Sequence, residues 1–159
     1  MAFNSNEFRK VLGNFATGVT VVTTRDQSGI PHGLTANSFS SVSLEPPLVL
    51  FCIDKRSNCL PAFNEADAFA INVLTDKQKD ISDRFAFSEE RWEGVKTRTL
   101  QTGVPILEDC LANLDCSMHA QYDAGDHVIV VGKVEETLIQ NEGDPLLYFR
   151  GKYRGVHIE

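Results

Sequence analysis

The sequence of 159 residues lacks the segments that direct a protein into or across a membrane. It has no apolar run approaching the about 18 residues of a membrane span. Its N-terminus has neither the apolar stretch nor the cleavage-site pattern of a secretory signal. We therefore expect a cytoplasmic protein with no membrane partner. Its length and its 42% hydrophobic and 23% charged residues predict a single domain over residues 1–159.

Basic charge is also scarce, with 15 Lys and Arg against 22 Asp and Glu and a net charge of −7. Nucleic-acid-binding proteins usually present a basic face, so this composition argues against such a partner. The four cysteines form no CxxC pair, and the four histidines are scattered. We expect no metal site, and free, buried thiols in a reducing compartment.

Three common enzyme motifs are missing from the sequence. There is no GxGxxG, no GxxxxGK[ST] and no GxSxG. These absences argue against a Rossmann dinucleotide site, a P-loop and an α/β-hydrolase. Any dinucleotide must then bind by other means.

The segments that are present predict short strands, frequent turns and few helices. Such a pattern favours an antiparallel barrel over a βαβ sheet. We expect an ordered loop at 36–45 and an irregular excursion at 86–104. The expected helices are 4–16, 58–65 and 77–85, and the expected strands are 19–24, 30–35, 48–53, 69–74, 112–122, 128–136 and 146–149, the last with an open extension toward residue 157.

Three segments together resemble the flavin reductase family that has the FMN-binding split-barrel fold. They are Gly18–Thr24 followed by Gly33–Pro47, then Cys52–Ser57, then Gly125-Asp126-His127. The closest likeness is to the short reductase components of two-component flavin-dependent monooxygenases. The resemblance implies a mainly β fold, a six-stranded antiparallel split β-barrel with peripheral helices.

The resemblance also implies a function. Such enzymes use NADH or NADPH to reduce FAD or FMN, and they supply the reduced flavin to a separate oxygenase. They are typically homodimers with the flavin site near the subunit interface. The sequence does not choose between the flavins or the nicotinamides. Three alternatives stay open: an enzyme of this fold that retains its flavin and acts on another small acceptor, a non-catalytic flavin- or haem-binding module, and a structural barrel.

The expected flavin site combines short polar groups with cations. Residues 35–38 offer backbone and side-chain groups to the flavin pyrimidine edge, and residues 55–57 offer charge-assisted hydrogen bonds to a phosphate. On residue type alone these are also ordinary features, a polar turn and an exposed basic turn. The predicted flavin-binding residues are Thr35, Ala36, Asn37, Ser38, Ser40, Cys52, Asp54, Lys55, Arg56, Ser57, Asn58, Cys59, Arg84 and Phe85.

The resemblance places His127 close to the nicotinamide, with Asp126 holding the turn or orienting the histidine. Tyr148 and Lys152 are predicted to contact NAD(P)H by stacking and by charge. We expect no acid or base catalyst, because hydride passes between the cofactors. A structural histidine, and an amphipathic edge strand at 148–153, are the competing interpretations. Trp92 could cover the site or fill a dimer contact.

Overall fold

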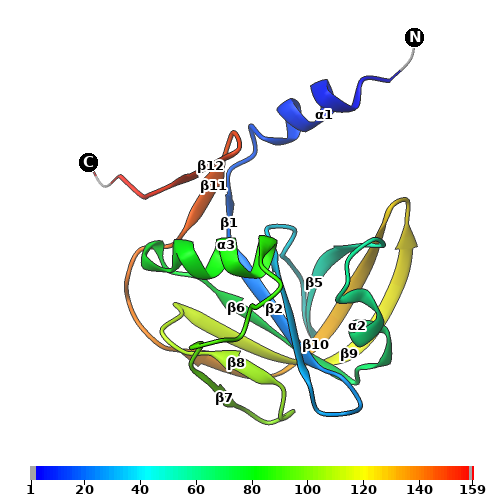
Figure 1. The fold of residues 1–159 in the computed structure, drawn as a ribbon. Coiled ribbons are helices and arrows are strands. Elements are labelled where there is room, and N and C mark those ends of the chain that lie inside the picture. Colours follow the sequence, from blue (N-terminus) through cyan, green and yellow to red (C-terminus); the bar gives the residue numbers. More distant parts are fainter. Residues whose placement is uncertain (1–2, 158) are drawn as a thin grey trace.

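The computed structural model describes residues 3–157 and 159, and it consists mainly of antiparallel strands (Figure 1). The helices are α1 (Ser5–Leu12), α2 (Leu60–Glu65) and α3 (Lys79–Phe87), with a 3-10 turn η1 (Asp76–Gln78) before α3. The strands are β1 (Thr17–Gly18), β2 (Thr20–Arg25), β3 (Pro31–Ala36), β4 (Ser40–Leu44), β5 (Pro47–Asp54), β6 (Ala68–Val73), β7 (Thr97–Thr99), β8 (Pro105–Leu107), β9 (Ala112–Ala124), β10 (His127–Ile139), β11 (Leu147–Phe149) and β12 (Lys152–Arg154).

Seven of these strands form the main sheet, in the order β3-β2-β6-β9-β10-β5-β4. The expected mainly antiparallel β class is therefore confirmed. The expected count of six strands is not reproduced, because residues 40–44 form β4 where the sequence predicted part of a loop. Among the described strands this Ser-rich strand pairs with β5 alone, and it lies at the sheet edge. Exposed edge positions tolerate small polar residues, which hides such a strand from hydrophobic patterning.

The other boundaries follow the prediction with shifts at the ends. The first helix ends at Leu12, short of the expected residue 16, and Asn4 caps its N-terminus through hydrogen bonds to two backbone amides. The expected irregular region 86–104 contains the short strand β7, which pairs with β8. Gly125, with a φ of +64°, occupies the turn between β9 and β10, a backbone conformation that glycine adopts without strain.

A seam runs between β3 and β5. The two strands lie in contact, yet within the described residues no hydrogen-bonded ladder joins them, since β3 pairs with β2 and β5 pairs with β10 and β4. The curled sheet therefore has an open line along one side. Backbone groups along such a line lack strand partners and are available to other ligands.

The core beside this seam is built from aromatic side chains. Phe51 makes edge-to-face contacts with Phe63 and Phe69, at centroid distances of 5.4 Å and 5.2 Å, and all three rings are fully buried. Gly132, beside a register shift in β10, leaves room for the Phe69 ring. Such dense packing fixes the strands that carry the site.

The N-terminal helix α1 stands away from the sheet, near the three-stranded sheet of β1, β11 and β12 (Figure 1). This helix carries an apolar stripe that lacks a cover from the described residues of this chain. Phe8, Val11 and Leu12 are 47%, 63% and 55% exposed, and Phe15 is 79% exposed. None of the helices described here is long and apolar enough to span a bilayer.

Candidate flavin and nicotinamide site

A pocket of about 460 Å³ opens at the seam between β3 and β5. Its volume is within the usual range for small-molecule sites. It brings together predicted residues from four separate stretches of the chain. The predicted residues that line it are Thr35, Ala36, Asn37, Ser38, Cys52, Asp54, Arg56, Ser57, Asn58, Phe85 and His127.

One wall of this pocket is the end of β3 and the turn that follows it. The Gly33 carbonyl accepts hydrogen bonds from Cys59 and Arg91, so it points away from β2 and into the seam. Backbone groups two residues apart in a strand point the same way, so the N–H and C=O of Thr35 also face the seam. The Thr35 hydroxyl donates to the Ser82 carbonyl at 2.6 Å, which holds this wall against α3.

Ser38 connects the turn to the opposite strand. Its hydroxyl accepts from the Cys52 amide at 2.9 Å and donates to the Cys52 carbonyl at 3.2 Å. The serine side chain thus takes the place that a neighbouring strand would have beside β5. Its hydroxyl is already engaged, whereas the neighbouring Asn37 is exposed at the pocket mouth.

The predicted phosphate-binding cations have carboxylate partners. Asp54 accepts from Arg56 Nη2 at 2.8 Å and Nε at 3.1 Å, and these hydrogen bonds hold the pKa of the Asp54 carboxyl well below its usual range. Lys55 lies 3.0 Å from the Asp123 carboxylate. A phosphate in this part of the pocket must compete with Asp54 for Arg56.

His127 begins β10 and lies opposite Asp54 in the sheet register. Its Nδ1 is 2.7 Å from the Asp126 carboxylate, and this hydrogen bond lowers the pKa of Asp126. This contact orients the imidazole, and orienting it is one of the two roles suggested for Asp126, the other being to hold the turn. The half-buried ring lines the pocket and can present its other nitrogen to a ligand.

A smaller apolar notch of about 180 Å³ adjoins the pocket and shares Thr35, Asn37 and Ala86 with it. Tyr148 and Tyr153 line this notch, with ring centroids 5.7 Å apart. The Tyr153 hydroxyl donates to Asp83 at 2.6 Å and is hydrogen bonded to Ser82. The C-terminal strands therefore bring aromatic rings to the edge of the candidate site.

The remaining predicted residues lie outside the pocket. Ser40 is exposed on β4, Lys152 is exposed on β12, and Lys55 is held by Asp123. Arg84 donates to the Glu93 carbonyl at 2.6 Å. Cys59 is buried behind the pocket wall, and its thiol donates to the Gly33 carbonyl. Their proposed contacts with cofactor stay predictions.

Sequence reasoning missed Arg91, which reaches the pocket from the segment after α3. It also missed Leu34, Ile53 and Ala86, which complete the lining. Leu34 precedes the predicted Thr35 on β3, and Ile53 lies between the predicted Cys52 and Asp54 on β5. Knowing that these two strands face each other across the seam would therefore have identified both residues. Nothing in the local sequence distinguishes Arg91 from other loop arginines, since its position depends on how the loop folds back.

A larger cavity than the pocket at the seam lies elsewhere. It measures about 720 Å³ and lies beside η1 and β8, with four acidic residues in its lining, Asp76, Asp80, Glu108 and Asp109. Two lysines, Lys77 and Lys96, offset only part of this negative charge. Phosphate-bearing cofactors are anionic, so the smaller pocket at the seam suits them better.

The sequence and the fold match a known family of flavin enzymes. The family model for the flavin reductase like domain matches residues 12–157, and the chain belongs to this family. It is 44% identical over 155 residues to HsaB of Mycobacterium tuberculosis, the reductase subunit of a flavin-dependent monooxygenase, with 96% of this chain and 82% of HsaB covered.

Two further relatives agree with this membership. SmoA of Agrobacterium fabrum, an FMN reductase (NADH), is 45% identical over 150 residues, with 94% of this chain and 85% of SmoA covered. The solved structure of the flavin reductase PheA2 superposes with a TM-score of 0.92 at 40% identity, covering 98% of this chain and all 100% of PheA2. The predicted family, and the predicted likeness to reductase components of flavin-dependent monooxygenases, are thereby confirmed.

Proposed function

We propose that this chain is an NAD(P)H:flavin oxidoreductase that supplies reduced flavin to a partner monooxygenase. The carrying observation is the pocket at the β3–β5 seam, which collects the unladdered edge of β3, short polar side chains and His127 in one place within the described residues. The balanced reaction is NAD(P)H plus flavin plus a proton, giving NAD(P)⁺ and reduced flavin. Hydride leaves nicotinamide C4 for flavin N5, so the cofactors carry the chemistry.

The residues of the seam fit a flavin ring. The Thr35 N–H and C=O face the pocket from a strand edge that has no partner there, which suits the donor and acceptor pattern of a pyrimidine edge. An N–H fixed in this position also stabilises negative charge on a reduced ring. Fully buried Phe85 supplies an apolar floor to the same pocket.

His127 is proposed to orient the nicotinamide. The Asp126 carboxylate fixes the imidazole, and a fixed hydrogen-bonding side chain favours the geometry that hydride transfer needs. The adjoining notch with Tyr148 offers a further aromatic surface for the same cofactor. SmoA is named as an NADH enzyme, which supports NADH as the reductant.

We further propose a homodimer and an oxygenase as partners, in the cytoplasm. The exposed apolar side chains of α1 form one patch, whereas ordinary protein surfaces carry such side chains singly. A second copy of the chain would cover this patch. HsaB is named as the reductase subunit of a monooxygenase, which supports the oxygenase partner. Light scattering should give twice the chain mass of 17.6 kDa.

The deciding experiment is anaerobic mixing of the purified protein with FAD or FMN and NADH or NADPH, followed by the visible flavin absorbance. Rapid bleaching at catalytic protein concentration is expected. Absence of bleaching with every combination would contradict the proposed activity and favour a binding module. Bleaching of tightly retained flavin alone would favour an enzyme that acts on another acceptor.

A matched pair of variants tests the role of His127. His127→Ala should raise the KM for NADH while flavin binding, measured by titration, is retained. His119→Ala is the control, because His119 is exposed on β9 and lines none of the described pockets. Unchanged NADH kinetics in His127→Ala would remove this histidine from the site.

A further inference from the structure

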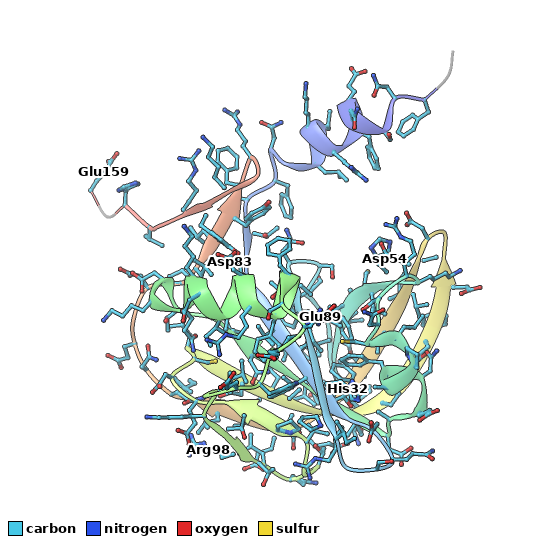
Figure 2. The ribbon with its side chains drawn as sticks, viewed as in Figure 1. His32, Asp54, Asp83, Glu89, Arg98 and Glu159 are labelled. Carbon is cyan, nitrogen blue, oxygen red and sulfur yellow. The ribbon has the colours of Figure 1, made fainter. Side chains whose placement is uncertain are left out.

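A polar anchor holds the C-terminal strands β11 and β12 against α3. The Tyr153 hydroxyl donates its proton to the Asp83 carboxylate at 2.6 Å. A phenol has one proton, so the 2.8 Å hydrogen bond between Tyr153 and Ser82 is donated by the Ser82 hydroxyl. The Lys79 ammonium lies 5.4 Å from the centroid of the Tyr153 ring. Figure 2 shows Asp83 on the side of α3 that β11 and β12 approach.

Ser82 also connects this anchor to the wall of the pocket at the seam. It is fully buried, and its carbonyl accepts a hydrogen bond from the Thr35 hydroxyl at 2.6 Å. One residue of α3 therefore bonds β12 through its side chain and β3 through its backbone. Thr35 lines the pocket, whereas Tyr153 lies outside its lining. Two hydrogen bonds, both centred on Ser82, thus join Tyr153 to the pocket wall.

The wall formed by β3 needs this support because it is a strand edge. Thr35 pairs with Val21 of β2 on one side. On the other side, across the seam to β5, no ladder joins the described strands. A strand that is paired on one side only shifts more readily than one that is paired on both. The side-chain bond from Thr35 to Ser82 is an additional constraint, and it fixes β3 only as firmly as α3 itself is fixed.

The helix α3 contributes to the same pocket. It has nine residues, and two of them near its end, Phe85 and Ala86, line the pocket. These two residues lie within one turn of Ser82 and Asp83, to which Tyr153 is bonded. A fixed position at the anchor is therefore passed along a short rigid helix. Tyr153 in this way constrains both the β3 wall and the apolar floor.

We propose that Tyr153 is a positioning residue for the flavin ring, whose hydroxyl acts through Ser82 to hold the Thr35 wall and α3 in the arrangement that accepts the ring. This inference rests on the proposed function, because it takes the pocket at the seam as the flavin site. A wall that is ordered before the ligand arrives lowers the conformational cost of binding. The hydroxyl therefore contributes to flavin affinity without touching the flavin.

Removal of the Tyr153 hydroxyl tests this role without any turnover. Tyr153→Phe keeps the ring, and it should weaken flavin binding by about three- to tenfold, the loss expected for one hydrogen bond. Riboflavin, FMN and FAD are each titrated into the protein and followed by flavin fluorescence. The three losses should be equal, because the Thr35 wall meets the ring that these flavins share. Tyr122→Phe is the matched control, since Tyr122 is exposed on β9 and lies outside the pocket and the adjoining notch.

A double-mutant cycle separates positioning from a general loss of structure. Thr35→Val removes the hydroxyl that bonds to Ser82 and keeps the backbone groups that face the seam. In this background Tyr153→Phe should cause no further loss of flavin affinity, because the link through which it acts is already cut. Ser82→Ala cuts the link to Tyr153 from the other end and keeps the Ser82 carbonyl, so its loss should match that of Tyr153→Phe. Thermal denaturation checks that each variant is folded.

Steady-state assays add a second readout, since Tyr153→Phe should raise the KM for flavin and leave the KM for NADH unchanged. Unchanged riboflavin affinity in folded Tyr153→Phe would overturn the proposal. So would a loss confined to FMN and FAD, or an equal loss from Tyr153→Phe in the wild-type and Thr35→Val backgrounds. Each of these results leaves the proposed function standing, because wild type still binds flavin. If wild type binds none of the three flavins, the proposed function is wrong and the role of Tyr153 is wrong with it.

Discussion

Replacement of Asn72 by alanine should remove the central side chain of a buried polar network. Asn72 lies on β6 and is fully buried. Its Nδ2 donates to the Val21 carbonyl at 2.8 Å and to the Thr23 hydroxyl at 3.1 Å. Its Oδ1 accepts from the Leu107 amide at 2.9 Å and from Asn113 Nδ2 at 2.7 Å. One side chain thus joins β2, β6, β8 and β9.

The size of the expected stability loss follows from the hydrogen-bond donors that the substitution leaves without an acceptor. Alanine at position 72 leaves the Leu107 N–H without an acceptor in a dry interior, at a cost of about 1–3 kcal/mol. Asn113 loses one acceptor but keeps a hydrogen bond to the Leu107 carbonyl at 3.2 Å, so its loss is smaller. Together with the small cavity, we expect a loss of about 2–5 kcal/mol in the free energy of unfolding. Domains of this kind have only about 5–15 kcal/mol in total.

Urea denaturation followed by circular dichroism measures this loss, with the slope of free energy against urea checked for constancy. The matched control is Asn64→Ala, because Asn64 is exposed on α2 and should change stability by no more than about 0.5 kcal/mol. A loss below about 1 kcal/mol for Asn72→Ala, at unchanged slope, would refute the assignment of stability to this network.

Three other predictions follow from the core and the site. Gly132→Ala places a Cβ 2.8 Å from the Cys116 Cβ and against the Phe69 ring, so the free energy of unfolding should fall by about 1–3 kcal/mol. Denaturant titration measures this loss, and an unchanged midpoint would mean that the Phe69 ring moves freely. Burial raises the pKa of the Cys116 thiol to about 12, so at pH 8 a thiol reagent should modify half-buried Cys52 first. Bound flavin should slow the modification of Cys52, because Cys52 lines the pocket. Mass spectrometry measures both rates, and faster labelling of Cys116 than of Cys52 would contradict the prediction. The folded-state pKa of Asp54 is depressed by its arginine partner, so its stabilisation is present above the unfolded pKa of about 3.9 and is lost as the pH falls below it. Denaturation midpoints measured down this range should therefore fall less in Asp54→Asn than in wild type, and equal falls would show that the ion pair is inert.

The seam residues could be predicted because their segments resemble the flavin reductase family; residue type alone also allowed a polar turn and an exposed basic turn. The run Thr35–Ser38 is short and polar between two strand patterns, and Asp54–Ser57 follows a continuous apolar strand. Both stretches line the pocket, apart from Lys55, which turns outward to Asp123. Turn chemistry and strand periodicity act over a few residues, so one sequence reveals the strands and turns that carry these stretches, and the resemblance supplies their role.

The parts that escaped prediction depend on contacts between distant segments. β4 has no hydrophobic alternation and exists as a strand because β5 supplies backbone partners. Arg91 becomes a site residue because the Gly33 carbonyl, 58 residues earlier, points out of an unpaired strand edge and captures its guanidinium. The open seam thus creates the pocket proposed for flavin and also positions the cation beside it. Closing the seam by strand pairing would remove both, which explains why a split sheet suits this site.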